Sequence, residues 1–256
     1  MSGNVMRGTP RRLASGVRRA VRGRTIIPPS SLVSVIANRP GKPFALRYAN
    51  LKLWCRPEDW LSAVEVLLDD EYAPVMELLD GVPAPIVYDG GANIGAFGLR
   101  VLASAPGARV VSVEPDPGTY AELARTAAAH AGWTPVAGAL WDREESLAIA
   151  PGVASTGNRV TPADAGGGVG AVTLHGLMEQ LGHDHVDVLK LDIEGAEERV
   201  LLGDPELLER VGAVIVEIHP DACDERRIVE LLERRYARCD RLVRESAKPV
   251  LLASDR

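Results

Sequence analysis

Cysteine is scarce in this sequence of 256 residues, since only Cys55, Cys223 and Cys239 are present and no two form a Cys-x-x-Cys pair. Neither a disulfide framework nor a thiolate zinc site is therefore expected. The sequence also has no apolar run of about eighteen residues and no continuous apolar core of a secretory signal at its N-terminus. We accordingly expect a cytoplasmic protein without stable membrane insertion.

Acidic residues are absent from the first part of the chain. Residues 1–57 contain twelve Lys or Arg and no Asp or Glu, whereas the remainder contains seventeen basic and thirty-five acidic residues. Because basic clusters alone are unspecific, we expect the basic arm, residues 1–43, to pack on the acidic body or to be disordered. Aromatic residues make up only 4% of the chain, which disfavours a stacking platform for nucleic acid. The non-enzyme alternative is a protein that uses this arm to associate with nucleic acid or a membrane, with a secondary cofactor site.

The stretch that organises the rest of the chain starts with the apolar run Ile86–Asp89, followed by Gly90, Gly91 and Gly95. This pattern is typical of a buried strand, a tight turn and a helix start. Glycines let the backbone approach a ligand, and the helix begins with free N–H groups. The dinucleotide fingerprint needs glycines spaced two and then three apart, but here alanine or Asn93 stands where the second glycine belongs. The stretch therefore predicts a nucleotide-cofactor turn and disfavours a nicotinamide dehydrogenase.

Strand-like and helix-like runs alternate from residue 86 onward. Strands are expected at 86–89, 109–114, 134–139, 186–192, 213–219, about 240–244 and 250–253. Helices are expected at about 96–105, 118–131, 196–202 and 224–235. This alternation predicts an α/β fold with a mostly parallel seven-stranded sheet and helices on both faces. We divide the chain into the arm 1–43, a small N-terminal cap or lid at 44–80 with a hairpin and a helix at about 61–79, and the α/β domain 81–256, in which 152–170 is a flexible glycine-rich insertion.

Two acidic positions follow the second and third expected strands. Glu114, followed by Pro115 and Asp116, offers a carboxylate that can accept hydrogen bonds from both hydroxyls of a ribose. Asp142 offers an acceptor for an adenine amino group, and Trp141 offers a face for stacking. Alternatively, Asp142 is a surface acid and Trp141 is a core tryptophan.

Four ordered motifs resemble those of a known family. They are Asp89–Gly95, Glu114–Asp116, Val188–Glu197 and Val216–His219. In order and residue pattern they resemble the successive motifs of the FkbM family of S-adenosylmethionine-dependent methyltransferases. This chain departs from the family at Thr173–His175, where the family typically has Thr-Leu-Asp.

The resemblance implies a Rossmann-like class I methyltransferase fold, S-adenosylmethionine as cofactor, and methylation of a hydroxyl on a sugar or natural-product scaffold. Antibiotic or other natural product biosynthesis is the expected context, and the expected partner is a small-molecule acceptor. The alternative chemistry is N-methylation of an amino sugar or related amine. The residues expected to bind the cofactor are Asp89, Gly90, Gly91, Asn93, Gly95, Glu114, Pro115, Asp116, Trp141, Asp142 and Asp192.

A group of polar residues ends the fourth and fifth main strands. On extended chains Lys190, Asp192 and Glu194 share one direction, as do Glu217 and His219. Such side chains are unexpected at the ends of buried parallel strands unless they face a ligand crevice, so we expect the two strands to be neighbours.

Transfer of an already activated methyl group requires alignment and removal of the acceptor's proton. A histidine of near-neutral pKa suits that proton transfer. We therefore expect His219 to be the general base, with Asp192, Glu194 and Glu217 orienting the acceptor or the base and Lys190 in the same catalytic group.

Three alternatives remain for this group. Glu194 can lie in the first turn of the following helix, where the helix dipole favours a carboxylate. His219 can be a hydrogen-bonded residue that ends a strand. Asp192, Glu217 and His219 can hold a divalent cation such as Mg²⁺, which is not favoured because no dense ligand motif is present. The sequence leaves open whether Tyr48, Trp54 and Trp60 of the cap stack on the acceptor or pack in the cap, and whether the chain forms a homodimer.

Overall fold

A computed structural model describes residues 41–68, 72–150, 158–163, 168–242 and 248–256. Residues 1–40 of the basic arm lie outside these ranges. The expectation that the arm packs on the body or is disordered therefore concerns residues that the structure does not describe. Among the helices of the described ranges, none has both the length and the apolar character needed to cross a lipid bilayer.

A seven-stranded sheet forms the centre of the molecule, in the order β12-β13-β11-β10-β3-β4-β5. The strands are β3 (Ile86–Gly90), β4 (Arg109–Glu114), β5 (Trp133–Ala137), β10 (Val186–Leu191), β11 (Val211–Glu217), β12 (Arg238–Arg241) and β13 (Val250–Ser254). The first five pair in parallel, whereas β13 lies antiparallel between β11 and β12. The predicted mostly parallel seven-stranded sheet is confirmed.

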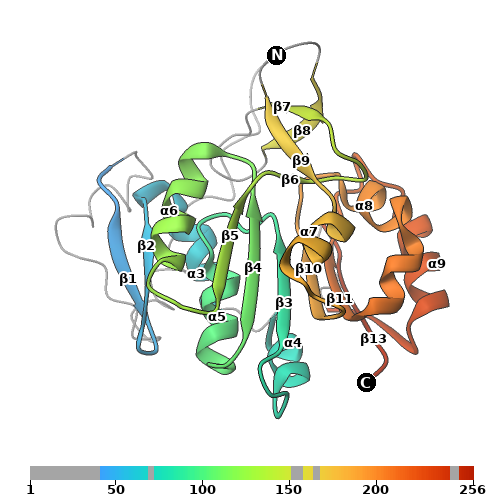
Figure 1. Ribbon diagram of the computed structural model, residues 1–256, viewed down its shortest axis with the longest axis horizontal. Helices are drawn as coiled ribbons and strands as arrows, with labels where there is room; N and C mark the ends of the chain where they lie inside the picture. The colour runs from blue at the N-terminus through green and yellow to red at the C-terminus, as the bar shows by residue number, and fades with distance from the viewer. Residues whose placement is uncertain (1–40, 69–71, 151–157, 164–167, 243–247) are drawn as a thin grey trace, which may run out of the picture.

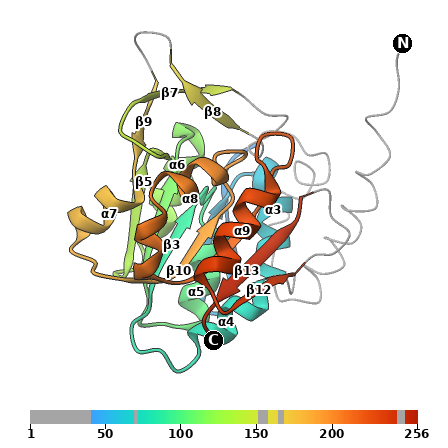
Figure 2. The ribbon, with the colours of Figure 1, turned by 90° about the vertical axis from the view of Figure 1, so that its right-hand side faces the viewer.

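Two groups of helices cover the two faces of this sheet (Figures 1 and 2). The first comprises α3 (Trp60–Leu68), α4 (Ala73–Leu79), α5 (Ala96–Ser104) and α6 (Pro117–Ala127). The second comprises α7 (Leu174–Leu181), α8 (Glu197–Gly203), η3 (Pro205–Arg210) and α9 (Glu225–Arg235). Successive residues of each buried strand point to opposite faces, so Val87 belongs to the core under the first group and Tyr88 to the core under the second.

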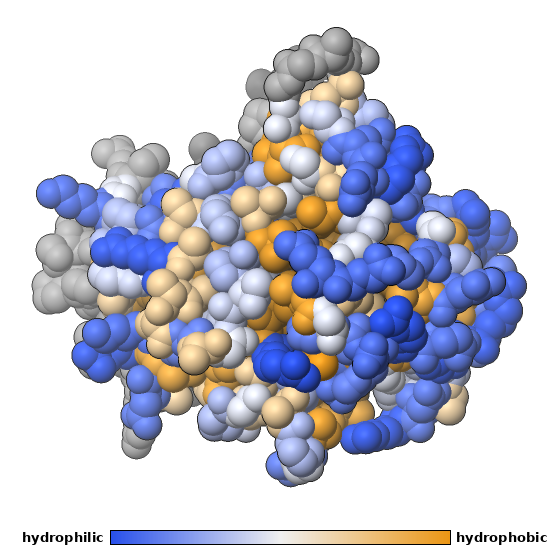
Figure 3. Space-filling view, viewed as in Figure 1, coloured by the Kyte–Doolittle hydropathy of each residue, from blue (hydrophilic) through white to orange (hydrophobic). Residues whose placement is uncertain are grey.

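The outer side of the second group is strongly charged. Hydrophilic residues gather over α8 and α9, on the right of the space-filling view in Figure 3. In α9, Ile228, Leu231 and Leu232 are buried, while the other residues of this arginine- and glutamate-rich helix keep it amphipathic. The same two helices come to the front in Figure 2.

The N-terminal cap contains the predicted hairpin, in which β1 (Phe44–Tyr48) pairs antiparallel with β2 (Leu51–Cys55). The single helix expected at 61–79 is instead η1 (Pro57–Asp59), α3 and α4, with residues 69–71 outside the description. The hairpin packs on α6. The backbone N–H of Trp54 donates to Oγ1 of Thr126 at 3.0 Å, and the Arg125 guanidinium lies 3.2 Å from the centroid of the Trp54 ring. Trp60 is fully buried and Tyr48 packs on the same core, whereas Trp54 lies on the other face of β2, half-buried under the Arg125 guanidinium.

A second, four-stranded sheet lies in part within the insertion expected at 152–170. Its order is β6-β9-β7-β8, with β6 (Ala139–Leu140), β7 (Ser146–Ala150), β8 (Arg159–Pro162) and β9 (Val169–Val172). The prediction of a flexible insertion is therefore wrong for residues 159–162 and 169–170, which pair as strands. Residues 151–157 and 164–167 lie outside the described residues. β7 and β8 project at the top of Figure 1. Arg159 of β8 is ion-paired with Asp221, which follows the carboxyl end of β11.

Candidate active site

The turn after β3 adopts backbone conformations that few side chains tolerate. Gly91, Asn93 and Gly95 have φ values of 69°, 51° and 92°. An added Cβ atom at Gly91 would lie 1.8 Å from the carbonyl oxygen of Asp192. Helix α5 begins directly after Gly95, so the first N–H groups of a helix lie beside this turn. The glycine at position 91 is therefore required by the close approach of two backbone segments.

Asp89 and Lys190 form a buried ion pair beneath this turn. The Lys190 Nζ lies 3.1 Å from Oδ1 of Asp89 and donates to the carbonyl oxygen of Gly91 at 2.9 Å. Burial lowers the pKa of Lys190, but the carboxylates of Asp89, Asp192 and Glu217 together outweigh this effect, and the net shift is upward. Both residues are buried, so these contacts favour a positioning role for Lys190 over the catalytic one expected from the sequence.

Glu114 at the end of β4 faces the same turn. Its Oε2 accepts from the N–H of Asn93 and its Oε1 from the N–H of Asp116, both at 2.9 Å. Burial raises the pKa of Glu114 to about 7. Asp116 instead caps α6, because its Oδ1 accepts from the N–H of Thr119 at 2.7 Å. Pro115 lies half-buried between them.

Asp142 and Trp141 follow β6 and contact the start of α8. Oδ2 of Asp142 lies 3.1 Å from the Arg199 guanidinium, which also covers the Trp141 ring at 4.6 Å from its centroid. Oδ1 of Asp142 is buried and has no hydrogen-bond partner among the described residues. A buried acceptor of this kind calls for a donor.

The triplet that departs from the family pattern lies beside Asp142. A pocket of about 220 Å³ is lined in part by Asp142 and by Thr173–His175. Thr173 caps α7, since its Oγ1 accepts from the N–H of Gly176 at 3.0 Å. The departure therefore adjoins the expected adenine contact.

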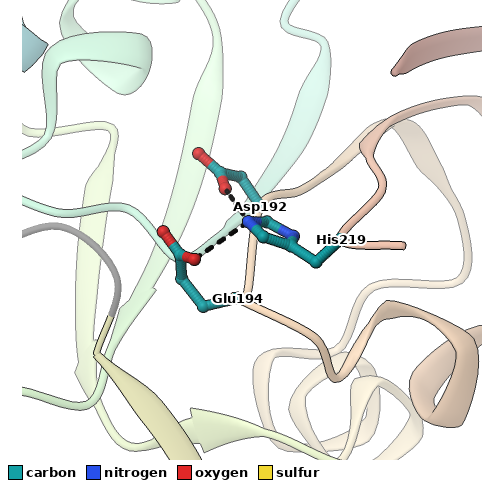
Figure 4. A group of neighbouring side chains, drawn as sticks. All are labelled: Asp192, Glu194 and His219. Atoms are coloured by element: carbon teal, nitrogen blue, oxygen red, sulfur yellow. Dashed lines mark ion pairs between the residues drawn. The ribbon is translucent and has the colours of Figure 1, made fainter. Parts of the chain in front are cut away.

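The carboxyl ends of β10 and β11, which are parallel neighbours as predicted, bring together Asp192, Glu194 and His219. We call these three residues the carboxylate–histidine cluster (Figure 4). Nε2 of His219 lies 2.9 Å from Oε2 of Glu194 and 4.0 Å from Oδ1 of Asp192. The His219 side chain is fully buried, whereas those of Asp192 and Glu194 are 30% and 18% exposed. A ligand can thus reach the two carboxylates while the imidazole stays fixed behind them.

Glu197, the first residue of α8, holds the other side of the imidazole ring. Its Oε1 lies 2.9 Å from Nδ1 of His219 and accepts from the N–H groups of Ile193 and Gly195 at 3.0 and 3.1 Å. Glu194 lies before the helix, with a φ of 54°, which corrects the alternative that placed it in the first helical turn. Sequence reasoning missed Glu197, because a glutamate at a helix start is ordinarily explained by the helix dipole.

The charges around His219 differ from the near-neutral histidine expected. Burial of the ring favours its neutral form, but Glu194 and Glu197 outweigh this and raise the pKa of His219 to about 10. Burial likewise raises the pKa of Glu194, but His219 and Lys248 outweigh it and lower that pKa to about 2. The expectation of a near-neutral pKa is therefore wrong, since carboxylates face both ring nitrogens. A doubly protonated ring has no lone pair with which to accept the acceptor's proton.

Lys248, just before β13, completes this side of the site. Its Nζ lies 3.3 Å from Oε2 of Glu194 and 3.5 Å from Oε1 of Glu217. Glu217 is thus connected to the cluster through Lys248. Within the described ranges, the three groups with ligand atoms within 4.8 Å of one another are Asp192, Glu194 and His219, so Glu194 replaces Glu217 in the set expected for a cation. The sequence carried no signal for Lys248, which reaches the site only because β13 pairs with β11.

Comparison with known proteins identifies the family. Residues 89–240, more than half of the chain, match the domain described as "Methyltransferase FkbM domain". The chain belongs to the FkbM methyltransferase family. The matched residues contain the glycine turn, Glu114, Asp142 and the carboxylate–histidine cluster. S-adenosylmethionine is accordingly the cofactor.

Two curated relatives are similar in sequence to this FkbM methyltransferase. The AMB antimetabolite synthetase AmbE of Pseudomonas aeruginosa is 29% identical over 200 residues, which are 60% of this chain and 9% of AmbE. Methyltransferase sdnD of Sordaria araneosa is 30% identical over 186 residues, which are 58% of this chain and 72% of sdnD. The chain thus spans less than a tenth of AmbE and nearly three quarters of sdnD.

Two of the solved structures that resemble this chain have low sequence identity to it. The N-terminal domain of EvdMO1 with SAH bound has a TM-score of 0.46 and 13% identity, and covers 73% of this chain and 80% of that one. Precorrin-6y C5,15-methyltransferase from Geobacter metallireducens has a TM-score of 0.45 and 13% identity, and covers 72% of this chain and 87% of that one.

The described residues of this FkbM methyltransferase fit S-adenosylmethionine. The glycines of the turn present backbone atoms beside the first N–H groups of α5, so a cofactor can approach this backbone closely. Glu114 keeps further acceptor capacity on both carboxylate oxygens, as two ribose hydroxyls require. The orphaned Oδ1 of Asp142 suits a donor such as the adenine amino group. When bound, the cofactor supplies a methyl group activated by its sulfonium.

Proposed function

We propose that this protein is an S-adenosylmethionine-dependent O-methyltransferase that acts on a hydroxyl of a sugar or natural-product scaffold. The observation that carries the proposal is the contact between the glycine turn and the carboxylate–histidine cluster. The N–H of Asp192 donates to the carbonyl oxygen of Gly90 at 3.1 Å, and no Cβ fits between Gly91 and Asp192. An acceptor bound at the cluster therefore lies next to the cofactor turn.

The residues have separate tasks in the proposed reaction. Glu114 and Asp142 hold the ribose and adenine, while Asp192 and Glu194 hold the acceptor hydroxyl. The hydroxyl oxygen forms a bond to the methyl carbon, the carbon–sulfur bond breaks, S-adenosylhomocysteine leaves, and the hydroxyl proton passes to a carboxylate of the cluster. His219 keeps these carboxylates in place from its buried position.

The protonation state of the acceptor favours a hydroxyl over an amine. Glu194 and Glu197 share the charge of His219, and Glu194 and Glu217 share that of Lys248. Two cations thus face three carboxylates, and the site stays negatively charged before an acceptor binds. An amine would be held there as an ammonium group, which that charge stabilises and which must lose its proton before it can react, whereas a hydroxyl oxygen keeps a lone pair for the attack.

The relatives support a metabolite as the acceptor. AmbE is named an antimetabolite synthetase and sdnD a methyltransferase, and both match a large part of this chain. We infer that this enzyme modifies a secondary metabolite.

The proposal can be tested by product analysis. Purified protein is incubated with S-adenosylmethionine carrying a ¹³C-labelled methyl group and with panels of glycosylated, polyketide and amino-sugar acceptors. We expect formation of S-adenosylhomocysteine and a product whose labelled carbon has the NMR shift of a methyl ether. A labelled N-methyl signal would overturn O-methylation, and binding of S-adenosylhomocysteine without turnover on any panel would overturn the proposed acceptor class.

A further inference from the structure

We propose that Asp192, Glu194 and His219 form a binding site for one divalent transition-metal cation. The site adds to the proposed function, and only the catalytic use of the cation rests on that function. The cation site itself is inferred from the geometry of the described residues.

The spacing of the three side chains suits a shared ion. Two ligand atoms that each lie about 2.1 Å from one ion are roughly 3 Å apart at a right angle and roughly 4.2 Å apart on opposite sides. Nε2 of His219 lies 2.9 Å from Oε2 of Glu194 and 4.0 Å from Oδ1 of Asp192, and all three atoms lie within 4.8 Å of one another. Figure 4 shows both carboxylates on the Nε2 side of the ring.

The imidazole provides independent evidence for a ligand at this place. His219 is fully buried, and its Nε2 points into the cluster, where it lies 2.9 Å from Oε2 of Glu194 but has no partner of hydrogen-bond geometry within the described residues. The opposite nitrogen, Nδ1, faces Oε1 of Glu197 at 2.9 Å. A carboxylate that accepts from one ring nitrogen while the other points to the remaining ligands is the usual arrangement around a metal-binding histidine, because it fixes the tautomer and the ring orientation. A bound cation would take the place of the proton on Nε2.

Glu197 is itself held rigidly, as a residue with this task requires. The backbone N–H groups of Ile193 and Gly195 donate to its carboxylate at 3.0 and 3.1 Å. It therefore positions the ring and is not a fourth ligand. The remaining coordination positions face the partly exposed side of Asp192 and Glu194, where an acceptor hydroxyl or water can enter.

The ammonium group of Lys248 competes with a metal cation for the Glu194 carboxylate. Its Nζ lies 3.3 Å from the same Glu194 oxygen that faces His219, and 3.5 Å from Glu217. Its side chain is 43% exposed, so the ammonium can move away from Glu194 while it stays near Glu217. Removal of this ammonium should therefore strengthen cation binding.

The donor set indicates the class of metal. One imidazole and two carboxylates suit Mn²⁺, Fe²⁺ or Zn²⁺ better than Mg²⁺, which prefers an all-oxygen shell. A cation at this place would lower the pKa of an acceptor hydroxyl, which then loses its proton to water before it attacks the methyl carbon. This step replaces proton transfer to a cluster carboxylate, since those carboxylates would be ligands.

Binding is tested with the full-length protein freed of metal by EDTA and desalting. MnCl₂ is titrated while the free-ion signal is followed by electron paramagnetic resonance, and ZnCl₂ binding is measured by calorimetry. We expect one ion per chain, binding weakened by about ten-fold or more in Asp192→Asn and Glu194→Gln, and tighter binding in Lys248→Met. Glu198→Gln is the matched control, because Glu198 follows Glu197 in α8 but its carboxylate pairs with Arg227.

The outcomes separate this inference from the proposed function. Thermal melting first establishes that each variant is folded. No stoichiometric ion in wild type and Lys248→Met, or equal binding in wild type and Glu194→Gln, would overturn the cation site. Methyl transfer that persists in EDTA alongside such a result leaves the proposed function standing. A bound ion without methyl transfer to any acceptor leaves the site standing and overturns the proposed function.

Discussion

The two halves of this site are built on different physical bases. The cofactor half, residues 89–95 with Glu114, depends on backbone shape, with positive φ at three positions of one turn. The half proposed to bind the acceptor, which we call the acceptor half, consists of the carboxylate–histidine cluster with Glu197 and Lys248 and depends on charged side chains from three separate segments. Cofactor binding should therefore be lost when a side-chain atom is added to the turn, and methyl transfer should be lost when a charge is removed from the acceptor half.

The largest effect is expected from Gly91→Ala in the cofactor half. The added Cβ would lie 1.8 Å from the Asp192 carbonyl oxygen, at a φ of 69°. Calorimetry should detect no binding of S-adenosylhomocysteine, and the melting temperature should fall by several degrees. Gly81→Ala is the control, because Gly81 has a similar φ of 72° but nothing within 4 Å of its Cβ position. If both variants bind S-adenosylhomocysteine with equal affinity, the close approach at Gly91 is not needed for cofactor binding.

Glu197→Gln should damage the acceptor half alone. The neutral amide keeps the shape of the side chain but loses the charge that holds Nδ1 of His219. We expect kcat to fall by about ten-fold to a hundred-fold, while the affinity for S-adenosylhomocysteine stays within about three-fold. Glu198→Gln serves as the neighbouring control. An equal loss of cofactor affinity would show that the halves are not separable.

Glu114→Gln should weaken the cofactor half by a smaller amount than the glycine variant. The amide places a donor opposite the N–H of Asn93 or Asp116 and accepts from one ribose hydroxyl less well. Affinity for S-adenosylhomocysteine should fall by about ten-fold, or ~1.4 kcal/mol. Unchanged calorimetric affinity would remove Glu114 from the cofactor site.

The cofactor half should also respond to pH. Burial raises the pKa of Glu114 to about 7, so its carboxylate form, which accepts the ribose hydroxyls, gains population as pH rises through that value. Affinity for S-adenosylhomocysteine should increase by about ten-fold between pH 6 and pH 8, because the ionised fraction of Glu114 rises by that factor. The increase should be absent in Glu114→Gln, and an increase of the same size in that variant would assign it to another group.

The smallest effect on stability is expected from Arg159→Gln. Arg159 of β8 pairs with Asp221, and both side chains are well exposed. The melting temperature should change by less than about 2 °C, because exposed ion pairs contribute little. A clear loss of turnover on a bulky acceptor, with normal turnover on a small one, would place the β7–β8 hairpin in acceptor binding and extend the acceptor half beyond the cluster.

The difference between the halves also explains what the sequence could predict. The glycine turn and Glu114 lie close along the chain or at a strand end, so spacing alone indicated them. Strand and helix alternation predicted a mostly parallel sheet, and the polar ends of β10 and β11 predicted that these two strands are neighbours, which brings Asp192 near His219. The position of β3 beside β10 was not predicted.

Other contacts had no local signal. Glu197 turns inward toward a histidine twenty-two positions away, and Lys248 arrives through the pairing of β13 with β11. The raised pKa of His219 depends on two carboxylates whose directions are set by tertiary packing. The strand pairing of 159–162 was hidden because glycine-rich composition ordinarily indicates a loop.

The antiparallel strand β13 has a consequence for how the protein is made. It fills the gap between β11 and β12, and the carbonyl oxygen of Pro249 accepts from the N–H of Ile218, next to His219. A nascent chain that has emerged from the ribosome only as far as β12 has an open edge on β11 and lacks Lys248. Synthesis therefore delivers the cofactor turn early, whereas the acceptor half is assembled only after residues 248–254 have been translated.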